Sequence, residues 1–484
     1  MEEYLRSWMR NTLAVWMQYL LIALAAIPSV LFGLFLINRG VSEQQLLLIC
    51  VSLTLALAFV AWRFVFRRSH LFGGQGFNTE SPLFLADFKS EQSQGVTPLA
   101  RVPKILIISS DTGGGHRSAA AAIVAGVQRF FEGQSYAVRV VRAIEESHSI
   151  TAKLVAGYNW LLRNKQHWMK YLYWAINRFR PETREFFHKR CIAYVVEIFE
   201  RWCPNVVVSV HPLTQHIIAR VLRELNLADR IPLVSVVTDP SYGFWKGWAC
   251  DDVNLYLVAT DEARQQLIDY GIARDRIKIS GMPVHHKFSY PGEEAAKAAR
   301  AALGLNPEKF TVFVNAGWEG GGNIPEIFRE LVRGGLDVQA IFLAGKNEEL
   351  RADVESIAKR ASFPIKVIGY SDHVEQLMGA ANVMISKLGG LTTYEAFACR
   401  LPIIADGITP PMPQEAGAAS LLVKRGAGVV LRSASDIVPV IRRMVEDKVH
   451  YSLMREATMG LAIPNSTRRI VNEIVALLPA AAER

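Results

Sequence analysis

Short apolar segments alternate with helical stretches through most of this 484-residue chain, beginning near residue 100. This alternation is typical of parallel β-sheets that are covered by helices. The predicted strands form two series, residues 105–108, 138–141, 206–210, 233–237 and 255–258, and residues 312–315, 340–344, 365–368, 383–386 and 402–405. A loop and a charged, alanine-rich helix at residues 281–306 separate them. The pattern therefore predicts an α/β protein with two Rossmann-like domains, residues 101–285 and 286–484, facing a cleft.

A glycine loop follows the first predicted strand. The sequence Asp111-Thr-Gly-Gly-Gly-His116 joins that strand to an alanine-rich helix predicted over residues 118–128. The loop lacks the spacing of G-x-G-x-x-G, and no Gly-Lys-Ser/Thr follows it, so both nucleotide-binding fingerprints are absent. The glycines could simply make a tight turn, but they also let a ligand approach the backbone. Because a helix N-terminus disfavours imidazolium, we predict that His116 is neutral and accepts a proton near pH 7.

Polar and aromatic side chains also follow later strands of the first series. His211 ends the third predicted strand and either orients a substrate or caps the strand. Asp239 ends the fourth, where a carboxylate could orient the base, bind an acceptor hydroxyl or cap a turn. Trp245 and Trp248 form either an apolar lip for an acceptor or part of the core. Carboxyl ends of parallel strands share one edge of a sheet, so these residues should lie near the His116 loop.

A second strand, glycine loop and helix occur in the second series. Backbone N–H groups near Gly389, Gly390 and Thr392 can bind a diphosphate at the helix N-terminus, and Glu395 can accept the hydroxyls of a ribose. Gln414 and Glu415, at another predicted helix start, suit the hydroxyls of a sugar, although Glu415 could simply interact with the helix dipole.

The first 100 residues have a different character. Residues 13–37 carry no charge, and a second apolar stretch begins at residues 46–61. We predict a two-helix transmembrane hairpin over residues 1–68 and a linker over residues 69–100. A cleaved signal peptide, or one span with an interfacial helix, are the alternatives. Arginines flank the two spans outside the short turn, so the positive-inside rule predicts that the catalytic domain is on the cytoplasmic face of a membrane.

The net charge of +9 is concentrated in part around residues 157–190, where eight Lys or Arg accompany two Glu. Trp160, Trp168 and Trp174 are among the aromatic residues interleaved with these cations. Such a pattern predicts contact with anionic membrane lipids, and an amphipathic helix pair with a solvated face is the alternative. With membrane spans already predicted, nucleic acid is the least favoured partner. Five scattered cysteines without a C-x-x-C pair suggest neither metal nor redox chemistry.

Several motifs together carry a resemblance to a known family. They are Asp111-Thr-Gly-Gly-Gly-His-Arg117, Ser209-Val-His-Pro-Leu-Thr-Gln215, Thr238-Asp239, Ser386-Lys-Leu-Gly-Gly-Leu-Thr-Thr-Tyr-Glu395 and Gln414-Glu-Ala-Gly417. In this order they resemble the monogalactosyldiacylglycerol synthases and the related bacterial diacylglycerol glucosyltransferases. The likeness runs from about residue 104 to the C-terminus and gives no support to residues 1–100. The chain departs from the family pattern at Leu388 and in residues 240–248 and 316–322.

The resemblance implies a GT-B fold and an inverting, membrane-associated enzyme that transfers galactose from UDP-galactose to diacylglycerol. It implies that His116 is the base, with Asp239 beside it, and that the acceptor contacts His211 and Trp245. The donor-binding residues it implies are Gly115, Tyr370, Ser386, Lys387, Gly389, Gly390, Thr392, Glu395, Gln414 and Glu415. The UDP-sugar is a substrate, and no cofactor or metal is needed if helix dipoles and Lys387 offset the diphosphate charge.

Two other functions remain open at this point. One is transfer of glucose or N-acetylglucosamine to diacylglycerol or a polyprenyl lipid. The other is a membrane-tethered sensor of sugar nucleotides with a silent site, although a sensor would have no need of His116.

Overall fold

The computed structural model describes residues 102–131, 136–164, 168–317, 322–408 and 413–479. They belong to one compact unit, Val96–Arg484. The predicted hairpin, residues 1–68, and the predicted linker, residues 69–100, lie outside the described residues. Among the residues that are described, no helix combines the length and apolar character needed to cross a membrane.

Six parallel strands form the first sheet, in the order β2-β1-β3-β4-β5-β6. Its strands are β1 (Lys104–Ser109), β2 (Ala137–Arg142), β3 (Val206–Ser209), β4 (Leu233–Val236), β5 (Leu255–Val258) and β6 (Ile277–Ile279). The helices between them are α4 (Gly115–Phe130), α5 (Ala143–Ser147), α6 (Ser149–Asn164), α7 (Met169–Phe179), α8 (Glu185–Trp202), α9 (Thr214–Glu224) and α10 (Asp261–Asp269). Strand β1 is fully buried over Ile105, Leu106 and Ile107, as expected for a parallel strand covered on both faces.

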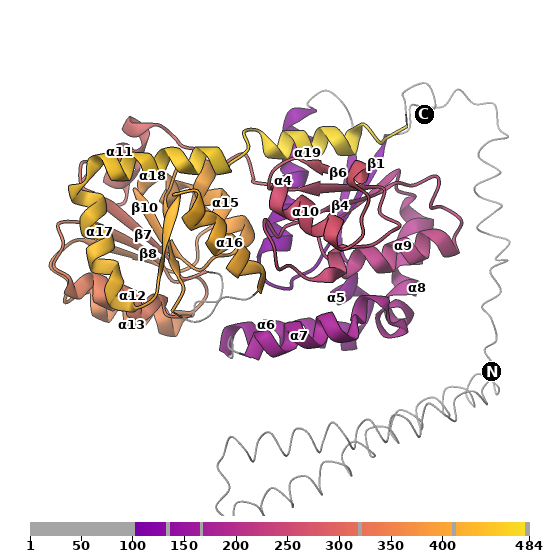
Figure 1. Ribbon diagram of the computed structural model, residues 1–484, viewed down its shortest axis with the longest axis horizontal. Coiled ribbons are helices and arrows are strands. Elements are labelled where there is room, and N and C mark those ends of the chain that lie inside the picture. The colour runs from indigo at the N-terminus through magenta and orange to yellow at the C-terminus, as the bar shows by residue number, and fades with distance from the viewer. Residues whose placement is uncertain (1–101, 132–135, 165–167, 318–321, 409–412, 480–484) are drawn as a thin grey trace, which may run out of the picture. The chain divides into compact units, whose positions relative to one another are not determined.

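The second sheet also has six parallel strands, in the order β12-β11-β10-β7-β8-β9. Its strands are β7 (Thr311–Asn315), β8 (Gln339–Leu343), β9 (Ile365–Ile368), β10 (Val383–Ser386), β11 (Ile403–Asp406) and β12 (Gly428–Leu431). Its helices are α11 (Glu293–Ala302), α12 (Ile324–Arg333), α13 (Glu348–Ala358), α14 (Val374–Ala380), α15 (Gly390–Ala398), α16 (Pro413–Lys424), α17 (Ile437–Glu446) and α18 (Lys448–Leu461). Figure 1 shows this part in orange and yellow and the first sheet's part in purple and magenta.

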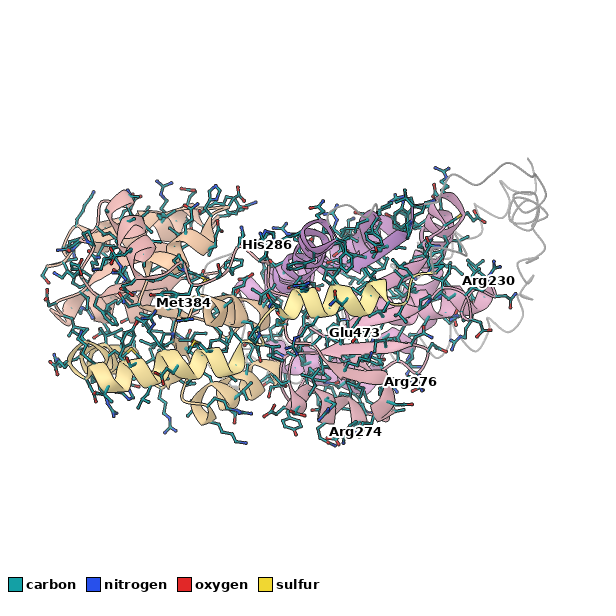
Figure 2. The ribbon with its side chains drawn as sticks, turned by 90° about the horizontal axis from the view of Figure 1, so that it is seen from above. Arg230, Arg274, Arg276, His286, Met384 and Glu473 are labelled. Atoms are coloured by element: carbon teal, nitrogen blue, oxygen red, sulfur yellow. The ribbon has the colours of Figure 1, made fainter. Side chains whose placement is uncertain are left out.

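The last helix, α19 (Ser466–Val475), returns to the first sheet and lies beside α4 (Figure 1). A Cβ on Gly126 of α4 would come within 2.7 Å of the Thr467 side chain, so the two helices are in close contact there. Lys278 of β6 forms an ion pair with Glu473 of α19 at 2.6 Å; Figure 2 labels Glu473 on this helix. The predicted second domain, residues 286–484, thus ends in a helix that packs on the first domain.

The ten predicted strands are confirmed to within one residue at each end. Two strands, β6 and β12, were not predicted. Each lies at an edge of its sheet. Strand β6 has only three residues, with the exposed Lys278 at its centre, and β12 begins at a glycine and has half-buried valines at its centre. Helix α4 begins at Gly115 rather than at the predicted Ser118, which places His116 in its first turn.

Candidate active site

His116 is fixed by the backbone of the neighbouring strand. Its Nδ1 lies 2.7 Å from the carbonyl oxygen of Val210, directly after β3, and 3.2 Å from the Thr238 hydroxyl. A carbonyl oxygen only accepts hydrogen bonds, so Nδ1 carries the proton and Nε2 of the neutral ring is a proton acceptor. Burial lowers the pKa of His116 to about 4, although the bond to Val210 opposes this shift. The predicted neutral imidazole therefore has both the tautomer and the environment of a general base.

His211 supports the same loop from β3. The Leu213 N–H donates to His211 Nδ1 at 3.2 Å, so His211 Nε2 carries the proton and donates to the Thr112 hydroxyl at 2.8 Å. The ring stands edge-on to His116 with centroids 4.6 Å apart. Burial, and secondarily the nearby His116, lower the pKa of His211 well below its usual value. The structure thus gives His211 a supporting contact to the glycine loop, in addition to its place on the cavity wall.

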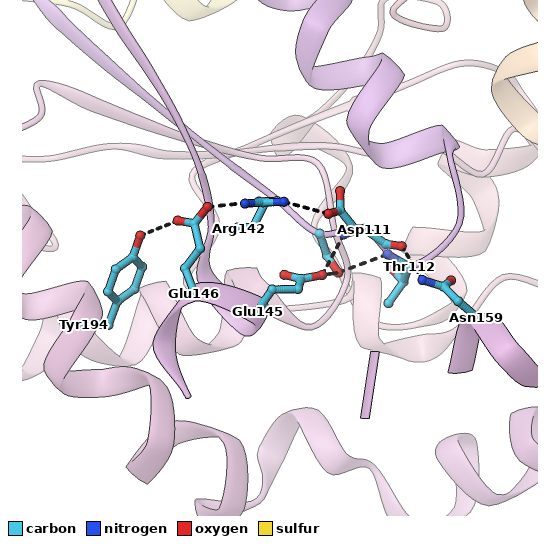
Figure 3. Close-up of polar contacts among 8 residues, drawn as sticks. Asp111, Thr112, Arg142, Glu145, Glu146, Asn159 and Tyr194 are labelled. Carbon is cyan, nitrogen blue, oxygen red and sulfur yellow. Dashed lines mark hydrogen bonds and ion pairs between the residues drawn. The ribbon is translucent and has the colours of Figure 1, made fainter. Parts of the chain in front are cut away.

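A polar network fixes the start of the glycine loop (Figure 3). One oxygen of Glu145, on α5, accepts hydrogen bonds from the Ser110 hydroxyl and the Asp111 N–H, both at 2.7 Å. Arg142 pairs with Asp111 at 2.9 Å and with Glu146 at 3.0 Å, and Tyr194 donates to Glu146. The loop before His116 is therefore held by β2, α5 and α8 as well as by its own strand.

Asp239 has a different partner from the one considered in the sequence. Its Oδ2 accepts a hydrogen bond from the Trp248 indole N–H at 2.7 Å, and the groups bonded to His116 Nδ1 are Val210 and Thr238. Burial raises the pKa of Asp239 to about 6, and the bond from Trp248 acts in the opposite direction. Orientation of the base therefore comes from the backbone, while Asp239 lies on the cavity wall. Trp248 is fully buried in the core.

The second glycine loop lies at the start of α15. Gly389 is the N-cap, and its N–H donates to the Lys387 carbonyl oxygen at 3.0 Å. Gly390 is the first residue of the helix, so its N–H belongs to the first turn, whose N–H groups have no partner within the helix. Glu395 lies one turn later and faces the same cavity. Burial raises the pKa of Glu395 to about 7, with Lys287 acting in the opposite direction. The start of α15 and the Glu395 carboxyl group thus border the same cavity, and the anion site there stays a prediction.

Both glycine loops border one cavity of about 1130 Å³. The predicted residues on its wall are Gly115, His116, His211, Asp239, Trp245, Tyr370, Gly389, Gly390, Thr392, Glu395 and Glu415. Ser386 and Lys387 do not line it. The predicted interaction of Lys387 with a diphosphate is therefore not supported: a Cβ on Gly322 would come within 2.6 Å of Lys387 Cε, and Asp406 lies against the same position. The side chain of Gln414 lies outside the described residues.

The two halves also touch beside this cavity. A Cβ on Gly390 would lie 2.6 Å from the Thr238 carbonyl oxygen, and a Cβ on Gly417 would lie 2.3 Å from that of Tyr242. Both distances are too short for a real side chain. Glycine at these two positions lets α15 and α16 approach the loop after β4.

The cavity extends from His116 along an apolar wall. Helices α6 and α7 contribute Leu161, Leu162, Leu172 and Ile176, together with Tyr158 and Tyr173. The three predicted tryptophans lie outside the cavity and are exposed, with 55% of Trp160, 44% of Trp168 and 65% of Trp174 accessible to solvent. The same pair of helices thus has an apolar inner side and an aromatic outer side.

Several residues of the site were missed by the sequence analysis. Thr238 lies next to Asp239, just after a strand, and that position could have indicated its contact with His116. Asn159, which bonds to the backbone of the glycine loop, lies in the middle of a helix with no motif around it. Lys287, near Glu395, lies in the connection between the two sheets. Their roles depend on tertiary contacts that no spacing encodes.

Comparison with known proteins finds relatives of this chain. The family described as monogalactosyldiacylglycerol (MGDG) synthase matches residues 116–284. A probable monogalactosyldiacylglycerol synthase of Glycine max is 29% identical over 382 residues, covering 77% of this chain and 71% of the relative. Monogalactosyldiacylglycerol synthase 1 of Arabidopsis thaliana is 28% identical over 385 residues, with the same coverage of 77% and 71%. A processive diacylglycerol beta-glucosyltransferase of Bacillus cereus is 28% identical over 275 residues, covering 56% of this chain and 68% of the relative.

Solved structures agree on the fold. UDP-GlcNAc 2-epimerase from Neisseria meningitidis, bound to UDP-GlcNAc, has a TM-score of 0.51 and 13% identity, covering 77% of this chain and 100% of that one. MurG of Acinetobacter baumannii has a TM-score of 0.50 and 13% identity, covering 77% of this chain and 99% of that one. The predicted GT-B fold, with two parallel six-stranded sheets, is confirmed. Residues 116–284 therefore match the model of the monogalactosyldiacylglycerol synthase family, and the curated relatives of the chain are named lipid glycosyltransferases.

Proposed function

We propose that this protein is a membrane-associated, inverting glycosyltransferase that transfers galactose from UDP-galactose to diacylglycerol. The observation that carries the proposal is the position of His116. Its Nδ1 is bound to the Val210 carbonyl, which leaves Nε2 as the proton acceptor, and it shares one cavity with the glycine loop at α15. A base and an anion site that face one cavity are what a direct displacement at a sugar phosphate requires.

In the proposed reaction, His116 Nε2 takes the proton of the acceptor hydroxyl as its oxygen attacks the anomeric carbon. The new carbon–oxygen bond forms as the bond from that carbon to the diphosphate breaks, and UDP leaves with the bonding electrons. A single displacement inverts the anomeric configuration. The N–H groups at the start of α15 stabilise the charge on the leaving diphosphate. A general base typically contributes about 10²- to 10⁴-fold to such a step.

The donor is assigned to the second half of the cavity. Glu395 accepts the ribose hydroxyls, Tyr370 contacts the uracil, and Glu415 with Gln414 binds the hexose. Support comes from the lining: Tyr370, Glu395 and Glu415 all border the cavity that contains the α15 N-terminus. No metal is assigned to this step, because the helix N-terminus lies beside the expected diphosphate.

The acceptor is assigned to the first half. Diacylglycerol has one hydroxyl and two long apolar chains, which match a base and the apolar side chains of α6 and α7 on the wall of one cavity. Asp239, His211 and Trp245 lie around the hydroxyl end, all on the cavity wall. The names of the curated relatives, which include diacylglycerol beta-glucosyltransferase, favour the same acceptor.

Membrane association is assigned to the outer side of α6 and α7. Trp160, Trp168 and Trp174 are exposed there, and the cation of Lys170 lies 5.0 Å from the Tyr171 ring centroid. Exposed aromatic residues beside cations suit the headgroup region of an anionic bilayer. We place this surface on a cytoplasmic leaflet, with the apolar residues 13–37 and 46–61 as an additional anchor.

Glucose is the second candidate for the transferred sugar, because one relative is a glucosyltransferase by name. The test is incubation of the full-length protein in diacylglycerol-containing vesicles with radiolabelled UDP-galactose or UDP-glucose, followed by chromatography of the lipids. We expect a labelled glycolipid that is formed faster from UDP-galactose. Faster labelling from UDP-glucose would reassign the donor, and binding or hydrolysis without a labelled lipid would contradict the proposal.

A further inference from the structure

Asn159 joins α6 to the loop that precedes the base. Its Oδ1 accepts a hydrogen bond from the Gly113 N–H at 3.0 Å, and its Nδ2 donates to the Asp111 carbonyl oxygen at 2.8 Å. Figure 3 shows the side chain beside Thr112. One amide group thus binds the backbone on both sides of Thr112, three residues before Gly115, the first residue of the helix that carries His116.

The glycine loop has little means of fixing itself. Gly113 has a φ of +72°, and a Cβ at Gly113, Gly114 or Gly115 would meet nothing within 4 Å, so packing does not confine this backbone. The N-cap of α4 is Gly114, which provides no side-chain cap. Glycine backbones have more conformational freedom than any other. The position of the loop therefore depends on hydrogen bonds from neighbouring elements.

Those neighbouring elements differ in what else they contact. Glu145 and His211 hold the loop from α5 and from the segment after β3. Asn159 holds it from α6, and the residues around Asn159 on this helix serve the acceptor side. Tyr158 lines the cavity, and Trp160 is exposed. The side chain that binds the base loop is thus flanked by one that faces the cavity and one that faces solvent.

We propose that Asn159 is a positioning residue that fixes the His116 loop relative to α6. The position of the His116 side chain then depends on how α6 lies against the acceptor. This inference rests on the proposed role of His116. Loss of the amide leaves two backbone groups without that partner and lets the loop shift. A misplacement of about 1 Å can reduce the rate of a chemical step about 100-fold.

The test compares two asparagine variants of the full-length protein in diacylglycerol vesicles. Asn159→Ala removes the bonds to the glycine loop. Asn205→Ala is the matched control, because Asn205 Oδ1 accepts a bond from the Lys104 N–H at 2.8 Å, at the opposite end of β1. We expect kcat of Asn159→Ala to fall about 10- to 100-fold with the KM for UDP-hexose within about twofold of wild type. Asn205→Ala should lower thermal stability but keep kcat within about twofold.

Hydrogen exchange of the loop amides provides a readout that does not require turnover. Residues 112–117 should exchange faster in Asn159→Ala and at the wild-type rate in Asn205→Ala. An unchanged exchange rate in Asn159→Ala, or a kcat within about twofold of wild type, would overturn the inference. A KM for UDP-hexose that rises as much as kcat falls would also overturn it, because a general distortion of the site would then be the cause. If wild-type protein labels no lipid, the proposed function fails, and the exchange rates still decide whether Asn159 holds the loop.

Discussion

The protonation of His116 is set by its surroundings rather than by an acidic partner. Its Nδ1 donates to the Val210 carbonyl, and burial lowers its pKa to about 4. Asp239 is engaged instead with the Trp248 indole. The backbone fixes the tautomer, and burial keeps the imidazole neutral over the whole physiological pH range.

A pH profile tests this environment. Because the lowered pKa keeps His116 unprotonated until the pH falls toward 4, kcat/KM for the acceptor at saturating UDP-hexose should stay within about twofold from about pH 7.5 to about pH 5.5 in Asp239→Asn, a variant that removes the carboxyl group whose pKa of about 6 falls in this range. A histidine with the ordinary pKa of about 6.5 would be about 90% protonated at the lower limit. The profile is measured with labelled UDP-hexose, and a loss of activity with a midpoint near pH 6.5 would contradict the prediction.

Glu395 is predicted to make donor binding pH-dependent in the neutral range. Burial raises its pKa to about 7, so the carboxylate to which we assign the ribose hydroxyls becomes protonated as the pH falls through 7. UDP-hexose should therefore bind up to about tenfold more weakly at pH 6 than at pH 8. Calorimetric titration measures this, and both phosphates of UDP-hexose are diesters that do not titrate there. Glu395→Gln should bind equally at both pH values; a pH dependence that persists in this variant would exclude Glu395 as its source.

For single residues, the sequence was informative where a side chain or backbone suited to binding also follows a predicted strand. Gly389, Gly390 and Glu395 follow a strand and open a helix, so their place at the cavity could be predicted. Lys387 follows the same strand, but its side chain is directed to Gly322 and Asp406, which are brought there by the tertiary structure. Asn159 could not be predicted, because its partner is a backbone loop 46 residues away in the sequence.

Among the elements, α19 stabilises the helix that carries the base. Thr467 donates to the Val284 carbonyl at 2.5 Å, and the Arg468 guanidinium lies 5.8 Å from the Phe130 ring centroid. The close approach at Gly126 has no room for a larger residue. Helix α19 thus packs on the C-terminal half of α4, at Gly126 and Phe130, away from the glycine loop.

Two glycine substitutions separate packing from helix propensity. Gly126→Ala should destabilise the protein, because overpacking against Thr467 and Val471 costs about 1–3 kcal/mol and exceeds the gain of about 0.5–1 kcal/mol in helix propensity. Gly460→Ala, in α18, is the control, since its Cβ would meet nothing within 4 Å and the substitution should be neutral or stabilising. Thermal unfolding measures both. Equal effects of the two substitutions would show that α19 does not pack on α4 as described.

The strands were easier to predict than the contacts between helices and sheets. Continuous apolar runs such as residues 105–108 and 383–386 require burial on both faces, which only an interior parallel strand provides. The edge strand β6 lacks this signal, because Lys278 interrupts it. The edge strand β12 is apolar but half-buried over its two valines, and it was missed. The return of α19 to the first sheet was not predicted, because amphipathic periodicity identifies a buried face of a helix but not its partner.

In the molecule as a whole, the cavity forms where the α/β unit of the first sheet faces the α/β unit of the second sheet. Each unit contributes a strand, a glycine loop and a helix N-terminus to one cavity. The first unit adds His116, the proposed base, and an apolar wall, and the second adds the proposed anion site and Glu395. Neither half contains all the groups needed for transfer, so catalysis requires that both remain in contact, as they do at Gly390 and Gly417.

The central claim is that His116 removes the proton from a diacylglycerol hydroxyl. Its most direct test is the initial rate of labelled glycolipid formation by His116→Ala in diacylglycerol vesicles, with affinity for UDP measured on the same preparation. We expect a rate lowered about 10²- to 10⁴-fold with the affinity for UDP unchanged. A folded His116→Ala protein that binds UDP and forms glycolipid at the wild-type rate would contradict it.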